Sequence, residues 1–378
     1  MGVLGGAGAM GRAVVHRLAR DGRRALVLDA DVAAARRIVR RYGTPGTVVA
    51  AADARDHERL TAQLSAVAVL VNCAPYPLNL DVMRAALAAR CHYIDLGGLF
   101  HMTRRQLALD RAFRSARLLA VLGMGSAPGI TNLLARDAAA RLRRVHRVRI
   151  YNGGADHTTY DTPLSFGFAP ATVLDELTQP AVVFARGRFR SVAPLARAED
   201  YTFEGGTQRV HATLHSEVAT LPSFFAKRGL RECAFLLAHD PVQLERLQLL
   251  VRLGLADTRP GSRGVAPRDV LLDAFRRLPL PPDFIDDRDF LSVVVEEERA
   301  RGSRSVRADF TAHPQRRPPL SAVARDTGFP PAIVAGMILD GAIKARGVHA
   351  PETCVPTRPF LAALRRAMGA PSSPPRRP

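Results

Sequence analysis

Three glycines near the start of the chain constrain its fold more than any other feature. Gly6, Gly8 and Gly11 have the spacing G-x-G-x-x-G, and they follow two apolar residues, Val3 and Leu4, that are typical of a strand. After the glycines, apolar positions recur at the period of a helix. The pattern predicts a strand, a tight turn and a helix. The sequence begins inside this strand, which favours a natural start a few residues upstream.

The predicted turn is suited to bind the pyrophosphate of a dinucleotide. A backbone without side chains lets phosphates approach, and the N–H groups and positive dipole end of the next helix attract negative charge. We therefore assign cofactor contacts to Gly6, Gly8, Ala9, Met10 and Gly11.

An acidic residue at the end of the next predicted strand indicates which dinucleotide binds. The apolar run 25–28 ends in Asp29, close to the offset at which a carboxylate hydrogen-bonds the ribose hydroxyls. This carboxylate would repel a 2′-phosphate, and Asp31 would add to the repulsion, so NAD is favoured. NADP stays possible, because Arg36 and Arg37 could turn back over the ribose.

Apolar runs and helical periods continue to alternate up to about residue 128. Helices are expected at residues 33–41, 57–64, 80–90 and 103–115, and strands at 47–52, 67–71, 92–95 and 118–122. The alternation predicts an α/β domain with a doubly wound parallel sheet, the Rossmann arrangement. Ligands of such sheets bind beyond the carboxyl ends of the strands, so the residues that follow each strand are candidates for the site.

Residues that follow two of these strands are candidate cofactor contacts. Asp53 follows the third strand and is placed to meet the adenine side of the cofactor, with a helix N-cap as the alternative. The loop after the fourth strand should run beside the cofactor through Asn72, Cys73, Ala74 and Pro75. Cys73 is better suited to be a small apolar filler than a nucleophile.

A second glycine-rich turn, GMGSAPGITN, follows the strand at 118–122. A helix start there could hold a carboxylate or the nicotinamide ribose, and a demanding connection between two domains is the alternative. We assign substrate contacts to Ser126, Pro128 and Asn132 in this turn, and to Tyr76 in the loop after the fourth strand.

From about residue 147 the pattern changes to short strands and turns, with one helix expected near 171–177. Residues 210–218 alternate in polarity, which predicts a strand with an apolar back and a polar front. A sheet facing a substrate would show this pattern, and so would a sheet facing solvent. The polar front consists of His211, Thr213, His215 and Glu217.

The last part of the chain predicts a hairpin, two helices and a tail. Residues 291–297 and 304–310 flank a glycine turn and are expected to pair. Helices are expected at 320–326 and 331–339. Residues 370–378 have no means of burying surface and should form a disordered tail.

Composition argues against several classes of protein. Only two of the 54 basic residues are lysine, so the net charge of +19 reflects an arginine-rich coding bias as much as affinity for a polyanion. The arginines are scattered and tryptophan is absent, which argues against a nucleic-acid partner. Because no apolar run reaches the ~18 residues of a membrane helix and no leader is recognisable, we expect a soluble, cytoplasmic protein. Four cysteines without a C-x-x-C pair predict neither disulfides nor a metal site.

Several segments together resemble the saccharopine dehydrogenase family. They are VLGGAGAMGRAVVHRLA (3–19), VNCAPYPLNLDVMRAALAARCHYIDLGG (71–98), GMGSAPGITNLLA (123–135) and DTGFPPAIVAGMILDGAIKARGVHAPE (326–352). Residues 162–189 are similar to the substrate domain of the lysine 6-dehydrogenase branch. The pair NCAPYP and HYIDLGG is more specific than the glycine motif.

The resemblance implies a Rossmann domain of residues 1–128 and an inserted α+β domain of residues 129–317 that binds substrate and builds a homodimer. Residues 318–369 would return as helices to the Rossmann domain. The resemblance also implies hydride transfer between NAD or NADP and the C–N carbon of an amino acid or polyamine. The acidic residue at position 29 departs from the NADP-type reductases of the family.

Three side chains are assigned to the chemistry. Hydride leaves an amine readily only when the nitrogen is unprotonated, so the reaction needs a base. His215 is the best candidate by its intrinsic pKa, and Glu217 could orient it or hold the substrate ammonium. Asp95 would complete the polar end of the site, unless it only caps the turn at Gly97. Lys227 is a candidate partner for a substrate carboxylate.

Two other functions stay open at this point. The chain could be a nucleotide-sensing protein without turnover, or a carbonyl or enoyl reductase on the same scaffold. The polar set of His211, His215 and Glu217 favours an enzyme that acts on a small-molecule amine.

Overall fold

The computed structural model describes residues 1–261, 264–300 and 302–369. Its first domain is built on a seven-stranded sheet of parallel strands in the order β17-β6-β5-β4-β1-β2-β3. The order reverses between β1 and β4, which is where ligands bind in doubly wound sheets. The strands are β1 (Gly2–Leu4), β2 (Leu26–Asp29), β3 (Val48–Ala51), β4 (Val69–Asn72), β5 (His92–Asp95), β6 (Leu119–Val121) and β17 (Gly347–His349).

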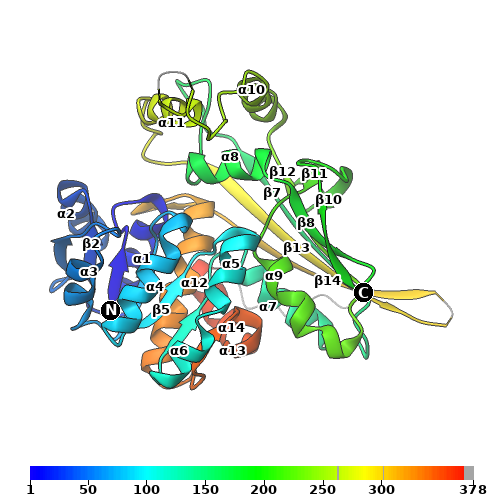
Figure 1. Ribbon diagram of the computed structural model, residues 1–378, viewed down its shortest axis with the longest axis horizontal. Helices are drawn as coiled ribbons and strands as arrows, with labels where there is room; N and C mark the ends of the chain where they lie inside the picture. The colour runs from blue at the N-terminus through cyan, green and yellow to red at the C-terminus, as the bar shows by residue number, and fades with distance from the viewer. Residues whose placement is uncertain (262–263, 301, 370–378) are drawn as a thin grey trace.

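Helices cover both faces of this sheet (Figure 1). Val3 and Val27 face a buried cluster that includes α1, whereas the next residues, Leu4 and Leu28, face a second cluster with α3 and α4. Because both faces of the sheet are covered, successive residues of each strand are buried, and the strand sequences are continuously apolar. The helices are α1 (Ala9–Arg20), α2 (Val32–Tyr42), α3 (His57–Leu64), η1 (Tyr76–Leu78), α4 (Asn79–Ala88), α5 (Leu99–Leu107) and α6 (Asp110–Ser115).

The last segment of the chain completes the first domain. β17 is the edge strand of the sheet beside β6, and α12 (Ala322–Leu339) packs on α1. Where the two helices cross, a Cβ on Gly328 would lie 2.6 Å from Ala13 Cβ and 2.8 Å from the Met10 carbonyl oxygen. Glycine is therefore required at the crossing. The segment also contains β15 (Gln315–Arg316), β16 (Pro319–Leu320), α13 (Pro351–Cys354) and α14 (Thr357–Met368).

A second domain is inserted between β6 and α12. Its sheet has the order β10-β11-β12-β7-β13-β14, and β8 joins it through β12, with β9 beside β8. β12 and β7 are parallel, and the other neighbours are antiparallel. The strands are β7 (Arg147–Asp156), β8 (Ala181–Ala185), β9 (Arg188–Val192), β10 (Glu199–Phe203), β11 (Gly206–Ala212), β12 (Glu232–Ala238), β13 (Asp287–Glu298) and β14 (Ser303–Ala312).

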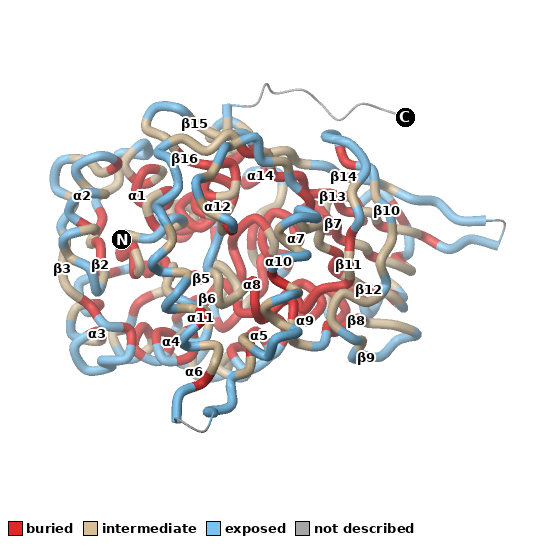
Figure 2. Tube along the Cα trace, turned by 90° about the horizontal axis from the view of Figure 1, so that it is seen from above, coloured by how far each residue is buried: buried red, intermediate tan, exposed pale blue. Residues whose placement is uncertain are grey.

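The helices of the inserted domain form two groups. α7 (Ile130–Ala139) and α9 (Glu217–Phe224) contact both this sheet and the first domain. At one end of the sheet lie α8 (Pro170–Thr178), α10 (Pro241–Arg252) and α11 (Pro267–Arg276) (Figure 1). The short helix η2 (Ala226–Arg228) follows α9. Buried residues concentrate in the middle of the molecule, whereas the far ends of β13 and β14 project with exposed residues (Figure 2).

The α/β fold class, with a parallel Rossmann sheet and an inserted α+β domain, is confirmed. The bounds of α3 and β5 are those predicted, and the expected hairpin is present as β13 and β14. No described helix is long and apolar enough to cross a membrane. The predicted tail at 370–378 lies outside the described residues.

Four details of the secondary structure differ from expectation. The strand predicted at 210–218 ends at Ala212, and its second half instead forms a turn and the start of α9. The single helix predicted at 103–115 is two helices, α5 and α6. The two helices expected before and after Pro331 form one helix, α12, because burial of most of its residues outweighs the low helix propensity of proline. α10 and α11 were not expected, although proline opens each of them.

We expect Gly328→Ala to lower the midpoint of thermal unfolding. Alanine normally stabilises a helix interior, but here its methyl group must displace α1, and overpacking of this kind costs about 1–3 kcal/mol. Gly336→Ala in the same helix is the matched control, because its Cβ would meet only Arg23 Nη2 at 3.8 Å and should raise the midpoint slightly. Equal midpoints for the two variants would contradict the close packing of α12 on α1.

Candidate active site

The glycine turn after β1 forms a cradle with no side chains. A Cβ on Gly6 would lie 2.4 Å from Val27 Cγ1, and a Cβ on Gly11 would lie 2.1 Å from the Gly5 carbonyl oxygen. Both glycines are therefore needed for the turn to pack against β2 and α1. A Cβ on Gly8 would meet only the Gly5 oxygen at 3.3 Å, so Gly8 mainly keeps the start of α1 open.

The start of α1 is suited to an anion. Gly8 is its N-cap and supplies no side-chain hydrogen bond, and the first turn contains no acidic residue. The first N–H groups of the helix are thus left for a ligand, and the helix dipole favours a negative one. The residues present fit a dinucleotide pyrophosphate at Gly6, Gly8, Ala9, Met10 and Gly11.

Asp29 lies at the end of β2 and faces this turn. Its Oδ2 accepts a hydrogen bond from the Ala7 N–H at 2.8 Å, and its Oδ1 accepts one from the Asp31 N–H at 3.0 Å. The carboxylate is half-buried and therefore fixed in direction beside the cradle. Arg36 and Arg37 are exposed on α2. Asp29 therefore lies beside the cradle, and its contact with the ribose stays a prediction.

Asp53 lies in the exposed turn after β3, where its Oδ1 accepts a hydrogen bond from the Arg55 N–H at 2.9 Å. The N-cap of α3 is Asp56, so the alternative role of Asp53 as this cap is wrong. Its contact with adenine stays a prediction.

The loop after β4 is held by a buried amide network. Asn72 Nδ2 donates to Asn79 Oδ1 and to Tyr93 Oη, both at 3.0 Å. Asn72 Oδ1 accepts from the Ala74 N–H at 3.1 Å, which shapes the loop towards Pro75. Asn72 therefore positions the loop, and its contact with the cofactor stays a prediction.

Cys73 lies in the same loop, against the glycine turn. Its carbonyl carbon would be 2.9 Å from a Cβ on Gly5. Burial raises the pKa of the Cys73 thiol to about 12, so the thiol stays neutral. This agrees with the role of a small filler.

Asp95 is fully enclosed where β5 and β6 end. Its Oδ1 accepts from the N–H groups of Gly97 at 3.0 Å and Gly123 at 2.6 Å, and its Oδ2 accepts from Gln106 Nε2 at 2.6 Å. Burial raises the pKa of Asp95, although these hydrogen bonds oppose the shift. With both oxygens occupied, Asp95 joins the two turns, and this geometry favours the capping alternative over proton transfer.

The turn between β11 and α9 is docked on the first domain. Ser216 Oγ accepts hydrogen bonds from the Gly98 N–H at 3.3 Å and from Thr103 Oγ1 at 3.1 Å. Gly98 follows β5, so this turn places His215 and Glu217 at the carboxyl edge of the Rossmann sheet. Ligands of such sheets bind at this edge.

His215 and Glu217 form a buried pair. His215 Nδ1 contacts Glu217 Oε2, and the His215 ring stacks on Phe235 with 3.7 Å between ring centroids. Glu217 Oε1 accepts a hydrogen bond from Thr131 Oγ1 at 2.8 Å, which fixes the carboxylate. The two residues are neighbours, as predicted, but through a turn and a helix start instead of a strand. His211 is not part of the pair, because its Nδ1 contacts the Leu195 carbonyl oxygen at 3.0 Å.

A second glutamate, Glu176 of α8, influences the same imidazole. Burial lowers the pKa of His215, but Glu217 and Glu176 raise it by a larger amount, so the net shift is upward. Burial raises the pKa of Glu176 to about 7, against the opposing effect of His215. Glu176 was not predicted, although an Asp-Glu pair within the apolar sequence TVLDELT is a signal that could have revealed it.

Tyr76 joins the loop after β4 to the inserted domain. Its hydroxyl donates to Asp175 Oδ2 at 2.7 Å, and Arg268 Nη1 lies 2.8 Å from Asp175 Oδ1. Burial, followed by Asp175, raises the pKa of the Tyr76 hydroxyl. Tyr76 therefore lies at the boundary of the two domains, near the helix that carries Glu176.

The residues predicted in the second glycine-rich turn are buried. Ser126 Oγ donates to Asp289 Oδ2 at 3.1 Å, and Asn132 Nδ2 donates to Glu352 Oε2 at 2.8 Å. Pro128 packs on this turn, where a Cβ on Gly123 would lie 2.5 Å from its Cγ. These contacts support the alternative interpretation of this turn, a connection between two domains that requires a particular backbone conformation.

Lys227 is not brought to the site. It is exposed in η2, beyond the last turn of α9, whereas His215 precedes the first turn of the same helix. An eight-residue helix is about 12 Å long, so Lys227 lies apart from the His215 and Glu217 pair. Its contact with a substrate carboxylate stays a prediction.

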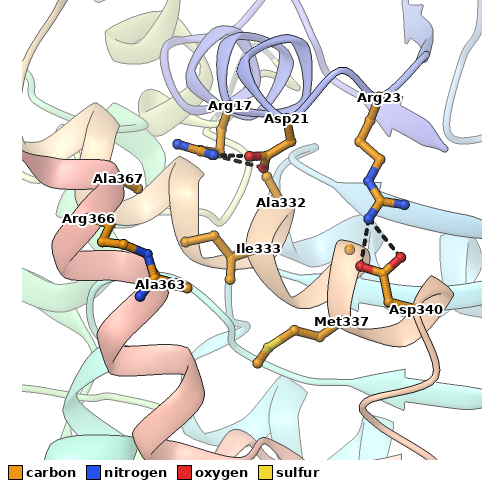
Figure 3. A pocket seen from close by; sticks show the side chains of 11 residues that line it. Arg17, Asp21, Arg23, Ala332, Ile333, Met337, Asp340, Ala363, Arg366 and Ala367 are labelled. Atoms are coloured by element: carbon orange, nitrogen blue, oxygen red, sulfur yellow. Dashed lines mark hydrogen bonds and ion pairs between the residues drawn. The ribbon is translucent and has the colours of Figure 1, made fainter.

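A cavity of about 450 Å³ lies elsewhere, between α1, α12 and α14 (Figure 3). Two of its arginines are already paired, Arg17 with Asp21 and Arg23 with Asp340. α1 and α14 each carry arginines in the last turn near this cavity, which compensate the negative ends of their helix dipoles. It is separate from the cradle and from His215.

Comparison with known proteins identifies the family. The model of the saccharopine dehydrogenase NADP binding domain matches residues 1–121, and that of the saccharopine dehydrogenase C-terminal domain matches residues 125–370.

Two known proteins illustrate the relationship. Carboxyaminopropylagmatine dehydrogenase from Synechocystis sp. is 25% identical over 268 residues, which are 66% of this chain and 65% of that protein. The match therefore spans slightly less than two thirds of that relative's length. Saccharopine dehydrogenase (L-Glu forming) from Saccharomyces cerevisiae has the same fold, with a TM-score of 0.75, 18% identity and 97% of each chain covered. The chain belongs to the saccharopine dehydrogenase family, and its first domain is of the type that binds a nicotinamide dinucleotide.

Proposed function

We propose that the protein transfers hydride between a nicotinamide dinucleotide and the C–N carbon of an amino acid or polyamine. The observation that carries this proposal is the docking of Ser216, which presents the His215 and Glu217 pair at the carboxyl edge of the Rossmann sheet. The names of the two relatives, dehydrogenases of saccharopine and carboxyaminopropylagmatine, support an amine as the substrate.

His215 is the proton acceptor in this proposal. Its Nδ1 faces the Glu217 carboxylate and therefore carries a hydrogen, which leaves Nε2 as the basic atom. Nε2 takes the proton of the substrate ammonium and thereby frees the nitrogen lone pair that expels hydride. A nicotinamide dinucleotide held by the glycine turn and Asp29 would supply the hydride acceptor. In the opposite direction the imidazolium returns the proton to the product amine.

The cofactor is held by the first domain. The start of α1 receives the pyrophosphate, and Asp29 receives the ribose hydroxyls, which makes NAD the preferred dinucleotide. Since Asp29 is fixed by two backbone N–H groups, its charge cannot easily move away from a 2′-phosphate.

We expect His215→Gln to lower kcat/KM for amine oxidation by about 10²- to 10⁴-fold, the usual contribution of a general base. The Kd for NAD should not change, because His215 does not contact the glycine turn. The measurement is reduction of NAD with a panel of lysine, saccharopine and diamines, beside titration of NAD. His146→Gln is the control, since His146 also pairs with a glutamate, Glu298, but at the surface. NAD binding without turnover of any amine would favour a nucleotide sensor.

The pH dependence of amine oxidation should depend on Glu217, whose carboxylate faces His215. The reaction needs the neutral imidazole, so kcat/KM should rise with pH through the raised pKa of His215. Because Glu217 raises that pKa, Glu217→Gln should move the midpoint of the profile to lower pH. Glu298→Gln should leave the midpoint in place. A midpoint unchanged in Glu217→Gln would remove His215 from the mechanism.

We expect Asp29→Asn to raise the Kd for NAD by about tenfold or more, which is the loss of a charged hydrogen bond. The Kd for NADP should change less, because repulsion of its 2′-phosphate is removed at the same time. Titration of both dinucleotides measures the ratio, with the surface variant Asp200→Asn as the control. If the ratio of the Kd for NADP to the Kd for NAD is the same in the variant and the wild type, Asp29 does not select the cofactor.

A further inference from the structure

The second glycine-rich turn, residues 123–132, is tightly folded. A Cβ on Gly129 would lie 2.2 Å from the Gly125 carbonyl oxygen, and the φ of Gly129 is +128°, so this position requires glycine. Asn132 Oδ1 accepts a hydrogen bond from the Gly129 N–H at 3.0 Å, which caps α7. The turn therefore fixes the direction of the first turn of α7, which carries Thr131.

Thr131 is fully buried and contacts the candidate site. Its Oγ1 donates a hydrogen bond to Glu217 Oε1 at 2.8 Å, and the other oxygen of the same carboxylate contacts His215 Nδ1. A hydroxyl has one hydrogen, and the Thr131 hydroxyl gives it to this carboxylate. Glu217 is fully buried as well, so the carboxylate is shielded from bulk water. Among the described residues, these are the two side chains that contact the Glu217 carboxylate.

A donor on one oxygen of a carboxylate changes the basicity of a histidine on the other oxygen. When the imidazole is neutral, hydrogen bonds alone compensate the negative charge of Glu217. When the imidazole is protonated, its own charge neutralises the carboxylate, so the hydroxyl contributes less. The Thr131 hydroxyl therefore stabilises the state with a neutral imidazole more than the protonated state. It holds the pKa of His215 below the value that Glu217 alone would give.

Other ionisable groups lie near the pair and act on it through charge. Burial lowers the pKa of the imidazole, and Glu217, followed by Glu176 of α8, raises it. Burial, followed by the effects of neighbouring groups that include Glu217, raises the pKa of Glu352 in α13 and of Cys233 in β12. On α5 and α7, which also pack on α9, the charged side chains are exposed or bonded elsewhere: His101, Arg104, Arg105, Arg136 and Asp137. A change of the threonine leaves all these groups in place.

We propose that Thr131 is a positioning residue that acts through Glu217: its hydroxyl stabilises the carboxylate and keeps His215 a base at lower pH than the contact with Glu217 alone would allow. The inference rests on the proposed function, in which His215 accepts the proton of the substrate. It also gives the second glycine-rich turn a role in the chemistry, because this turn places Thr131.

The test compares Thr131→Val, which keeps the shape of the side chain without the donor, with Thr131→Ser, which keeps the donor. One readout is the midpoint of the pH profile of kcat/KM for an amine that the wild type oxidises. The other is the pKa of the His215 imidazole from proton NMR, with the signal identified by its absence in His215→Gln. In Thr131→Val both values should rise by about one pH unit, roughly half of the contribution of a hydrogen bond to a charged group. Thr131→Ser should resemble the wild type.

The direction of the shift distinguishes this role from general damage to the site. Loss of the carboxylate in Glu217→Gln should move the midpoint to lower pH, whereas loss of the hydroxyl in Thr131→Val should move it to higher pH. At high pH, where the imidazole is neutral in both proteins, kcat/KM of Thr131→Val should approach that of the wild type.

Thr220→Val is the matched control. Thr220 is a buried threonine of α9, but its Oγ1 contacts the main-chain oxygen of Glu217 and the Asn132 amide, each at 3.5 Å, instead of the carboxylate. Both midpoints should therefore equal those of the wild type. The midpoint of thermal unfolding shows whether each variant is folded, and Thr131→Ala removes the same donor if valine is not tolerated in α7.

The outcomes separate the two proposals. Turnover of an amine with midpoints that are unchanged in Thr131→Val, or lowered as in Glu217→Gln, would overturn the role of Thr131 and leave the proposed function standing. Without turnover of any amine, a raised pKa of His215 in Thr131→Val would support the effect of the hydroxyl and contradict the proposed function. An equal rise in Thr220→Val would overturn the inference, because the effect would then not require a donor on the carboxylate.

Discussion

The Ser216 hydroxyl is the interaction on which the candidate site depends. It accepts hydrogen bonds from a backbone N–H and from a threonine of the Rossmann domain, and it is flanked in the sequence by His215 and Glu217. Two side chains from an inserted domain are thereby fixed at the edge of a sheet that belongs to another part of the chain. The hydrogen bond from Tyr76 to Asp175 is a second contact that joins the inserted domain to the Rossmann domain.

Charge is distributed unevenly between the surface and this site. Arginine dominates the surface, but the buried groups around His215 are carboxyls that stay close together because each has a different means of compensation. Glu217 faces the imidazole and a threonine hydroxyl, whereas Asp175 faces Arg268. Burial raises the pKa of Glu176 to about 7, and His215 opposes this shift.

The sequence predicts the first domain better than the site. Short-range patterns such as the glycine spacing and the apolar strands have one physical solution, so the parallel sheet and the position of Asp29 could be derived from them. The alternation at 210–218 is compatible with a strand, but Ser216 is drawn to the first domain, and the helix that follows starts at Glu217. Lys227 and Glu176 show the same limit, because their distance from His215 depends on contacts between residues far apart in the chain.

The return of the last segment has a consequence for biosynthesis. The edge strand β17 and the helix that crosses α1 come from residues after 321, so the Rossmann domain stays incomplete until residues 322–349 have left the ribosome. During translation, the apolar face of α1 that later meets Gly328 and its neighbours has no cover. Domains that close through such distant contacts fold slowly, so apolar surface stays exposed until this last segment docks.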